Sequence, residues 1–338
     1  MKKRCLSLGV ALGVALAATM CGFPARSEAV VRMKLGMKMT ESHHEGVALR
    51  HFTDTVKKRT NGEIVIDIFY GEVLGDSKKQ IENMIHGLQD FYAEGYSFYD
   101  AYVPEFRVIG GGVPYLFKDN DHYKRYLLSD MQKDIEQRLI EKAGLRIMNR
   151  DKNWLRGPYR VLATKKPVLS LEDLKGLKLR MASAPLSVKA WENLGASVIV
   201  LPYSETYLAL KQGTVDAVTC PVTDALYQKF CEVAPHLTVT HEYQQQVAVV
   251  MNEKRFQSLT KEQQEILYDA LREAGDICTK LAIENGEKLV KEMKEKYGVT
   301  FHEVDLAPWR EKIATFIPEL EKQGTIPAGF VEKVRAIQ

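Results

Sequence analysis

Residues 171–230 constrain the fold of this chain most strongly, because strand and helix patterns alternate there with short connections. Strands are predicted at Lys178–Met181, Ser197–Leu201 and Val215–Val218. An amphipathic helix at Pro185–Leu194 separates the first two strands, and a second helix precedes the third. This β-α-β-α-β order predicts a parallel sheet, and a ligand site at the carboxyl ends of its strands.

Three side chains fall at or just after the ends of these strands, namely Arg180, Tyr203 and Cys220. A guanidinium group in a cleft suits a carboxylate, because two parallel N–H···O bonds match the planar anion in shape and charge. Arginines form surface or interdomain salt bridges more often than they bind ligands. The residue type alone therefore leaves both roles open for Arg180.

The N-terminus has the organisation of an export signal. Basic residues at 2–4 precede an apolar run at 6–20, and the small residues of 27–29 fit a cleavage site. The apolar run is shorter than the ~20 residues needed to span a bilayer. We predict a signal peptide over residues 1–29 and a mature exported chain from Val30, with lipidation at Cys21 as the alternative.

Composition supports an exported, two-domain globular protein. A length of 338 residues is sufficient for two domains, each with its own core. The formal charge of +3 is spread along the chain, which argues against a nucleic-acid-binding face. The mature part has three cysteines, an odd number, so we expect no disulfide scaffold and no Cys220–Cys231 bridge.

The first hundred residues predict a second β-α-β-α-β unit. Its strands are expected at Val31–Met37, Ile64–Phe69 and Asp90–Ala93, and its helices at Gly46–Thr60 and Ser77–Leu88. Two such units, one at each side of a connecting segment, indicate two α/β domains.

The middle of the chain connects these units. Three consecutive glycines in Ile109–Phe117 lack a following GK[ST], so we interpret them as backbone that needs space and φ freedom, not as a phosphate loop. One helix is predicted over Tyr123–Ala143. The chain is expected to cross between domains at Asn153–Arg160, where Gly157–Pro158 interrupts regular structure.

The longest helical pattern covers Thr260–Tyr297. Thr260 and Gln263 fit a capping box, and Gly298 fits a C-terminal stop. At ~1.5 Å per residue the helix would be ~55 Å long, which exceeds the width of one domain. We expect it to span both domains, with a kink or break near Asn285–Gly286.

Three spaced motifs resemble the extracytoplasmic solute-binding subunits of TRAP transporters, which are tripartite ATP-independent periplasmic carriers of organic acids. They are DLKGLKLR, which ends at Arg180, then GASVIVLPYSETYLAL around Tyr203, and QGTVDA at 212–217. The resemblance covers nearly the whole mature chain. It implies an α/β, two-domain periplasmic solute-binding protein fold with a ligand cleft between the domains and a long helix spanning both. Domain I would comprise residues 30–156 plus about 245–285, and domain II residues 157–244 plus about 286–338.

The resemblance also assigns roles in the second domain. Arg180 matches the arginine that holds the ligand carboxylate in this family. Arg160 matches a second arginine, which would share the anion or hold a partner of Arg180, whereas Arg156 is expected to be exposed. Tyr203 would form the pocket wall. Cys220 stands where the family often has asparagine, so a hydrogen bond to the carboxylate is lost or the ligand differs.

Further cleft residues are expected around the first domain. Lys38, His43 and Glu94 match loop positions that line the cleft in the family. Trp154 would either stack on a ligand ring or pack between the domains. The adjacent His43 and His44 lack the helical spacing of a metal motif, so no metal is predicted. Glu205 is expected to cap the helix that follows it.

The predicted function is periplasmic binding of a small organic anion and its delivery to two integral-membrane TRAP permease subunits. The preferred ligand is a uronate or aldonate, and a C4-dicarboxylate or keto acid is the alternative. A binding component of an ABC importer or of a sensor is a second alternative. An exported enzyme, with Cys220 as nucleophile and His241 as base, is the third. No cofactor and no nucleic acid are expected, and the protein would be a monomer or weak dimer.

Overall fold

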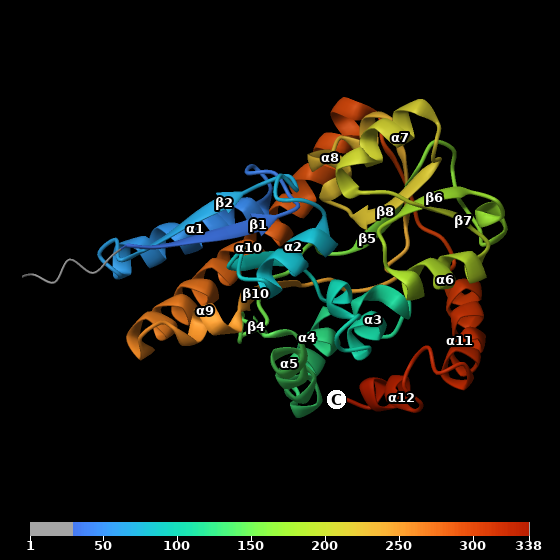
Figure 1. The fold of residues 1–338 in the computed structure, drawn as a ribbon. Coiled ribbons are helices and arrows are strands. Elements are labelled where there is room, and N and C mark those ends of the chain that lie inside the picture. Colours follow the sequence, from blue (N-terminus) through green and yellow to red (C-terminus); the bar gives the residue numbers. More distant parts are fainter. Residues whose placement is uncertain (1–29, 338) are drawn as a thin grey trace, which may run out of the picture.

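The computed structural model describes residues 30–337 and consists of two α/β lobes that lie side by side (Figure 1). Each lobe is built on its own sheet, and one long helix extends along both, so the predicted two-domain α/β fold is confirmed. The predicted signal peptide at residues 1–29 lies outside the described residues. Among the helices of residues 30–337, none is both long enough and apolar enough to cross a membrane.

The first lobe contains a five-stranded sheet in the order β2-β1-β3-β10-β4. Its strands are β1 (Val31–Met37), β2 (Ile64–Phe69), β3 (Phe91–Gly95), β4 (Leu145–Ile147) and β10 (Val247–Asn252). Strand β1 pairs in parallel with β2 and β3, while β10 returns from the second lobe and pairs antiparallel with β3 and β4. The predicted opening unit is therefore present, and it brings the end of β3 toward the second lobe.

The helices of this lobe are α1 (His44–Arg59), α2 (Ser77–Ile85), α3 (Glu105–Arg107), α4 (Asn120–Leu128), α5 (Asp130–Ala143) and α9 (Glu253–Gln257). The single helix predicted over Tyr123–Ala143 is wrong. Ser129 has an extended backbone with ψ of 159° and accepts a hydrogen bond from the backbone N–H of Gln132. It therefore ends α4 and caps α5.

The second lobe contains a six-stranded sheet in the order β11-β9-β5-β8-β6-β7. Its strands are β5 (Arg160–Thr164), β6 (Lys178–Met181), β7 (Ser197–Val200), β8 (Ala217–Pro221), β9 (His236–Val239) and β11 (Thr300–His302). Strand β6 pairs in parallel with β7 and β8, as predicted, while β5 is antiparallel to β8 and β9. The carboxyl ends of β6, β7 and β8 thus share one edge of the sheet.

The helices of the second half are α6 (Pro185–Leu194), α7 (Thr206–Gln212), α8 (Asp224–Tyr227), α11 (Ala307–Lys322) and α12 (Phe330–Arg335). Short 3₁₀ turns occur at Tyr96–Tyr99, Glu172–Leu174, Tyr203–Glu205 and Phe230–Glu232. Glu205 stands at the N-cap of α7, but its own backbone is helical and its side chain makes no capping bond. The predicted capping role of Glu205 is therefore wrong.

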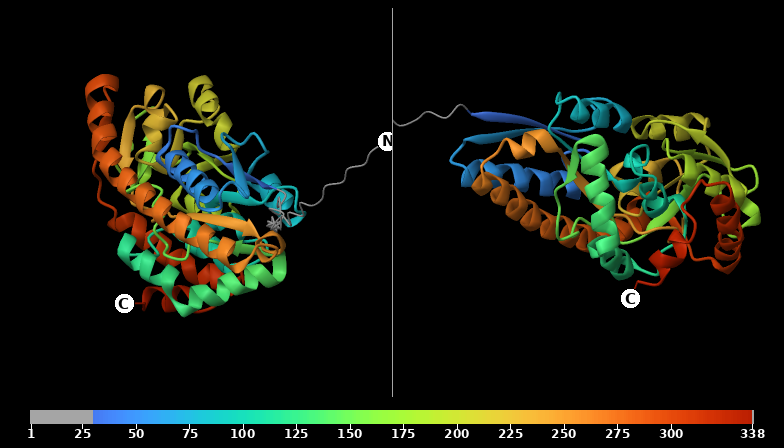
Figure 2. Two further views of the ribbon diagram at one scale, coloured as in Figure 1. Left: turned by 90° about the vertical axis from the view of Figure 1, so that its left-hand side faces the viewer. Right: turned by 60° about the horizontal axis from the view of Figure 1, so that its bottom comes forward.

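Helix α10 (Lys261–Tyr297) is continuous over 37 residues and runs along both lobes (Figures 1 and 2). The break predicted near Asn285–Gly286 does not occur. A Cβ atom on Gly286 would lie 3.0 Å from Cγ of Pro158, so this glycine lets the crossing segment approach the helix closely. Asn285 donates a hydrogen bond from Nδ2 to the Tyr227 hydroxyl at 3.1 Å, which ties the helix to the second lobe.

The three consecutive glycines at 110–112 stand where there is no room for side chains. Residues 108–112 form a π-helical turn in which Gly111 has φ of +94°. A Cβ atom on Gly112 would lie 2.1 Å from the carbonyl oxygen of Arg107. The predicted need for space and φ freedom is confirmed, and this turn forms part of the wall of the cavity between the lobes.

The N-terminus of α10 provides a test of the capping prediction. The Thr260 hydroxyl accepts from the backbone N–H of Gln263 at 3.1 Å, and the Gln263 side chain accepts from the backbone N–H of Thr260 at 3.1 Å. Replacing Thr260 by alanine should lower the free energy of unfolding by ~1 kcal/mol, because a helix N–H group loses its acceptor. Urea unfolding measures this. The control is Thr315→Ala on the exposed face of α11, which should change stability by less than ~0.5 kcal/mol; equal losses would contradict the capping role.

Candidate ligand-binding site

A cavity with two connected chambers lies between the lobes. The inner chamber has a volume of about 80 Å³ and the outer chamber about 340 Å³. Both are lined by Lys38, Arg180 and Tyr203, so the two chambers meet at these side chains. Six of the predicted site residues line the inner chamber: Lys38, Glu94, Arg160, Arg180, Tyr203 and Cys220.

Arg180, on β6, is buried at the meeting point of the two chambers. Its Nε donates to the carbonyl oxygen of Leu201 at 3.0 Å, and its Nη2 donates to the same oxygen. Burial lowers the pKa of Arg180 to about 10, so the group still carries its charge at neutral pH. Within residues 30–337 no carboxylate forms an ion pair with it, and Nη1 has no protein acceptor. One edge of the guanidinium is therefore available to an anion.

Arg160, at the start of β5, has protein partners for all three of its nitrogens. Nε donates to Glu242 at 2.7 Å, Nη1 donates to Gln245 at 2.7 Å, and Nη2 donates to Thr219 at 3.1 Å. Its Cζ lies 4.3 Å from the centre of the Tyr243 ring. Arg160 thus lies in the cavity wall with each nitrogen engaged by a protein group, and the two roles predicted for it, sharing the ligand anion or holding a partner of Arg180, stay predictions.

Arg156 corrects the prediction of an exposed side chain, since only 2% of its surface is accessible. Nε and Nη2 donate to the carboxylate of Glu45 at 2.8 and 3.1 Å, and Nη1 and Nη2 donate to that of Glu94 at 2.6 and 3.3 Å. The crossing segment passes through the interior between the lobes, so a side chain from it enters the core. Arg156 thereby pairs with two buried carboxylates that come from α1 and β3, and Lys38 supplies the second positive charge at Glu94.

Glu94 and Lys38 extend this buried network to the cavity. Lys38 Nζ lies 3.2 Å from a Glu94 oxygen, 5.0 Å from the centre of the Phe98 ring and 5.1 Å from that of Tyr203. Burial alone would raise the pKa of Glu94, but the charges of Arg156 and Lys38 outweigh it and lower the pKa to about 2. The Glu94 carboxylate is thus occupied by two cations, and Lys38 is the member of the network nearest the outer chamber.

Two of the predicted site residues, His43 and Trp154, line neither chamber. Both are fully buried. The Trp154 indole donates from Nε1 to the carbonyl oxygen of Leu271 in α10 at 3.0 Å. Trp154 therefore packs between the crossing segment and the long helix, and the alternative of stacking on a ligand is wrong. His43 contacts Asp224 of the second lobe instead of the cavity.

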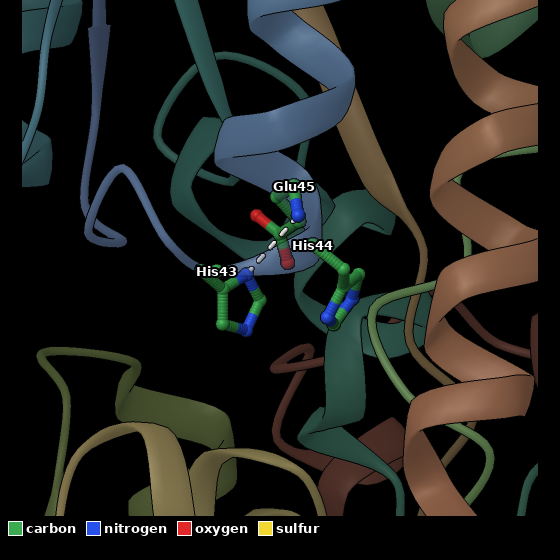
Figure 3. A group of neighbouring side chains, drawn as sticks. All are labelled: His43, His44 and Glu45. Atoms are coloured by element: carbon green, nitrogen blue, oxygen red, sulfur yellow. Dashed lines mark hydrogen bonds between the residues drawn. The ribbon is translucent and has the colours of Figure 1, made fainter.

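The trio His43, His44 and Glu45 has ligand atoms within 4.8 Å of one another (Figure 3). Its chemistry does not fit a metal ion. His43 accepts from the backbone N–H of Glu45 through Nδ1 and contacts Asp224 through Nε2, and the Glu45 carboxylate is held by Arg156. Burial lowers the pKa of His44 and keeps its ring neutral, as a metal ligand requires. A metal cation at this place would nevertheless lie beside the positive charge of Arg156.

Cys220, on β8, lies in the wall of the inner chamber with 1% of its surface accessible. Burial raises the pKa of its thiol well above the ordinary value, so the nucleophilic thiolate is disfavoured. His241, the base considered for it, lines neither chamber and lies instead in a separate small cavity. The three described cysteines are free thiols and are all buried.

The structure also adds residues that the sequence did not indicate. Thr219, Asp224, Tyr243 and Gln245 line the inner chamber together with Arg156. Thr219 precedes Cys220 on β8, and Asp224 begins α8 just after this strand. Thr219 and Asp224 could therefore have been predicted from their position at the end of a strand. Tyr243 and Gln245 come from the return segment before β10, where no such signal exists.

Comparison with known proteins identifies the family. Residues 35–323 match the model of "Bacterial extracellular solute-binding protein, family 7". The chain belongs to this family. It is 30% identical over 278 residues to the 2,3-diketo-L-gulonate-binding periplasmic protein of Escherichia coli (strain K12), with 82% of this chain and 83% of that protein covered. The predicted resemblance is confirmed, and both the family and this relative are named as binding proteins, not as enzymes.

Two further similar proteins are named with different acids. A TRAP periplasmic solute-binding protein from Ochrobacterium anthropi, solved with L-fuconate, is 28% identical, with a TM-score of 0.82 and coverage of 91% of this chain and 99% of that one. The C4-dicarboxylate-binding periplasmic protein of Rhodobacter capsulatus is 26% identical over 335 residues, which cover 97% of each chain. Proteins similar to this chain thus include one solved with a sugar acid and one named for C4-dicarboxylates.

The low pKa of Glu94 predicts a specific acid sensitivity. Glu94 ionises at about 2 in the folded protein and near 4.5 otherwise. As the pH falls below about 4.5 the unfolded chain takes up this proton first, so stability is lost between about pH 4.5 and 2, by about 3 kcal/mol. Glu94→Gln should be less stable at pH 7 and should lack this part of the pH dependence.

Unfolding free energies at pH 7, 4.5 and 3 measure the effect. The control is Glu311→Gln, at an exposed position of α11, which should retain the wild-type slope with pH. If Glu94→Gln and wild type lost stability in parallel over this range, Glu94 would not be held ionised by Arg156 and Lys38.

Proposed function

We propose that this family 7 protein binds a sugar acid, a uronate or aldonate, between its two lobes and delivers it to a membrane permease. The observation that carries the proposal is the buried Arg180 guanidinium, which has no carboxylate partner among residues 30–337. A buried charge is costly unless it is paired and hydrogen-bonded. A ligand carboxylate at the free edge of Arg180 would supply both the charge and the acceptors.

The outer chamber supports a hydroxylated tail over a second carboxylate. Its first-lobe wall carries four acidic side chains, Glu72, Asp76, Glu82 and Asp100, against two lysines, Lys38 and Lys78. A second carboxylate that extended from Arg180 into this chamber would face like charges, whereas hydroxyl groups could donate to these oxygens. The larger volume of this chamber also suits a ligand that extends beyond its carboxylate.

The relatives agree with this order of preference. The E. coli protein is named for 2,3-diketo-L-gulonate and the O. anthropi protein was solved with L-fuconate, both of which are sugar acids. The R. capsulatus relative is named for C4-dicarboxylates, which keeps that class as the second candidate. Because 2,3-diketo-L-gulonate is also a keto acid, a keto form of a sugar acid fits the same site. Service in an ABC importer or a sensor has no comparable support.

The same proposal includes the partners and the location. The closed protein would deliver its ligand to two integral-membrane TRAP subunits, driven by an ion gradient, as a monomer or weak dimer. Export to the periplasm would remove residues 1–29. Domain I would comprise residues 30–156 and about 245–285, and domain II residues 157–244 and about 286–338. The C-terminal segment of domain II would then contact the first lobe, since the Val334 carbonyl oxygen lies 3.1 Å from Nε2 of His122.

Removal of the Arg180 guanidinium tests the proposal. Arg180→Met should weaken binding of the preferred sugar acid at least about 30-fold, since truncating one member of a buried charge pair costs 2 kcal/mol or more. Isothermal titration with L-fuconate, D-glucuronate and succinate measures this. Arg310→Met, which removes an exposed guanidinium above the Tyr115 ring, is the matched control. Unchanged affinity in Arg180→Met, with the control also unchanged, would refute the proposal.

Substitution of Cys220 tests its part in ligand preference. Cys220→Asn replaces a weak donor by an amide that both donates and accepts, next to the inner chamber. Affinities are measured across a panel of aldonates, uronates and C4-dicarboxylates. We expect the affinity of Cys220→Asn for at least one of these acids to differ from the wild-type value by about tenfold or more, which changes the order of preference. The control is Cys220→Ser, which keeps the size of the side chain. Cys231→Asn is not a suitable control, because Cys231 is also buried. An identical ranking in all three proteins would place Cys220 outside ligand recognition.

A further inference from the structure

Three buried side chains connect the cavity wall of the second lobe to the first lobe. The Tyr203 hydroxyl donates to Oδ2 of Asp224 at 2.7 Å, and Nε2 of His43 lies 3.1 Å from Oδ1 of the same carboxylate. Tyr203 and Asp224 belong to the second lobe, whereas His43 precedes α1 in the first. We call these three residues the cross-lobe relay.

The direction of the hydrogen bonds in the relay is defined by the N-cap of α1. Nδ1 of His43 accepts from the backbone N–H of Glu45 at 3.2 Å (Figure 3). A ring nitrogen that accepts a hydrogen bond carries no proton, so the proton of the neutral imidazole is on Nε2. Nε2 therefore donates to Asp224. His43 and Asp224 are both fully buried, which makes this bond inaccessible to competing water.

The relay ends at a residue that shapes both chambers. The Tyr203 ring centre lies 5.1 Å from Cζ of Arg180 and 5.1 Å from Nζ of Lys38. The Asp224 carboxylate holds the hydroxyl end of this ring, and so determines where its face stands relative to the two cations. A change at His43 can thus reach the Arg180 site without any contact between His43 and the ligand.

We infer that His43 and Asp224 are positioning residues that couple approach of the lobes to the shape of the ligand site. Separation of the lobes would break the His43–Asp224 hydrogen bond and replace it by hydrogen bonds to water, so the arrangement with the lobes together gains the net free energy of a hydrogen bond to a charged acceptor. The bond therefore favours the arrangement with the lobes together. A ligand that binds this arrangement better stabilises the same state, so the two effects reinforce each other. This inference rests on the proposed function for its ligand-binding part.

Substitutions of His43 separate the relay from helix capping. His43→Asn retains an oxygen that can cap α1, but it is too short to reach Asp224. His43→Gln has a longer side chain whose amide can donate to Asp224. His51→Asn, at an exposed position of α1, is the matched control. Tyr203→Phe removes the other end of the relay.

Stopped-flow fluorescence with L-fuconate as the probe gives the rates. His43→Asn should raise the dissociation rate about 10- to 100-fold, and leave the association rate within about threefold, because the lost bond stabilises the bound state. His43→Gln should recover most of this loss, and the His43→Asn/Tyr203→Phe double variant should lose little more than the worse single variant. A lower melting temperature with unchanged dissociation would show a purely structural role and overturn the inference.

A measurement without ligand keeps this test independent of the proposed function. Spin labels at Lys57→Cys on α1 and Lys211→Cys on α7 report the distance between the lobes in the chain that begins at Val30, whose three native cysteines are buried. His43→Asn should shift the distance distribution to longer values, whereas His51→Asn should not. An unchanged distribution would overturn the inference. A shifted distribution in a protein that binds none of the acids would support the relay and reject the sugar-acid function.

Discussion

The arrangement between the lobes depends on one buried guanidinium, that of Arg156. It reaches Glu45 on α1 and Glu94 on β3 from the segment that crosses between the lobes, and Glu94 in turn contacts Lys38. Carboxylates and cations at these depths persist only because each has an oppositely charged neighbour in good geometry. The network fixes the crossing segment against the first lobe, and thereby fixes where the second lobe begins.

Arg180 has a different electrostatic environment. The other cations at the inner chamber each contact a carboxylate, Lys38 and Arg156 through Glu94, and Arg160 through Glu242. Arg180 uses one edge on the Leu201 carbonyl and has no such partner in the described chain. Because the neighbouring cations already have carboxylate partners, Arg180 is the cation whose free guanidinium edge can accept an incoming anion. The acidic wall of the outer chamber then restricts what can follow that anion.

Much of the fold could be predicted from local patterns, and the errors have a common physical origin. Strand β6 and helix α6 were predicted to the residue, because alternation and Pro185 at the first helical turn are local signals. Arg156 was expected to be exposed, because nothing in its neighbourhood shows that the crossing segment runs through the interior. Gly286 was interpreted as a helix break, yet close approach of Pro158 explains it. The strand-end rule brought Arg180, Tyr203 and Cys220 together, but the partners Glu242 and Gln245 come from a loop whose path only tertiary packing determines.

The central claim is that Arg180 binds the carboxylate of a sugar acid. A crystal structure of the protein with the tightest-binding sugar acid tests it most directly. Both carboxylate oxygens should lie within ~2.7–2.9 Å of Arg180 nitrogens, with the hydroxylated tail in the outer chamber. A ligand whose carboxylate lies elsewhere, with Arg180 still bonded only to Leu201, would contradict the account.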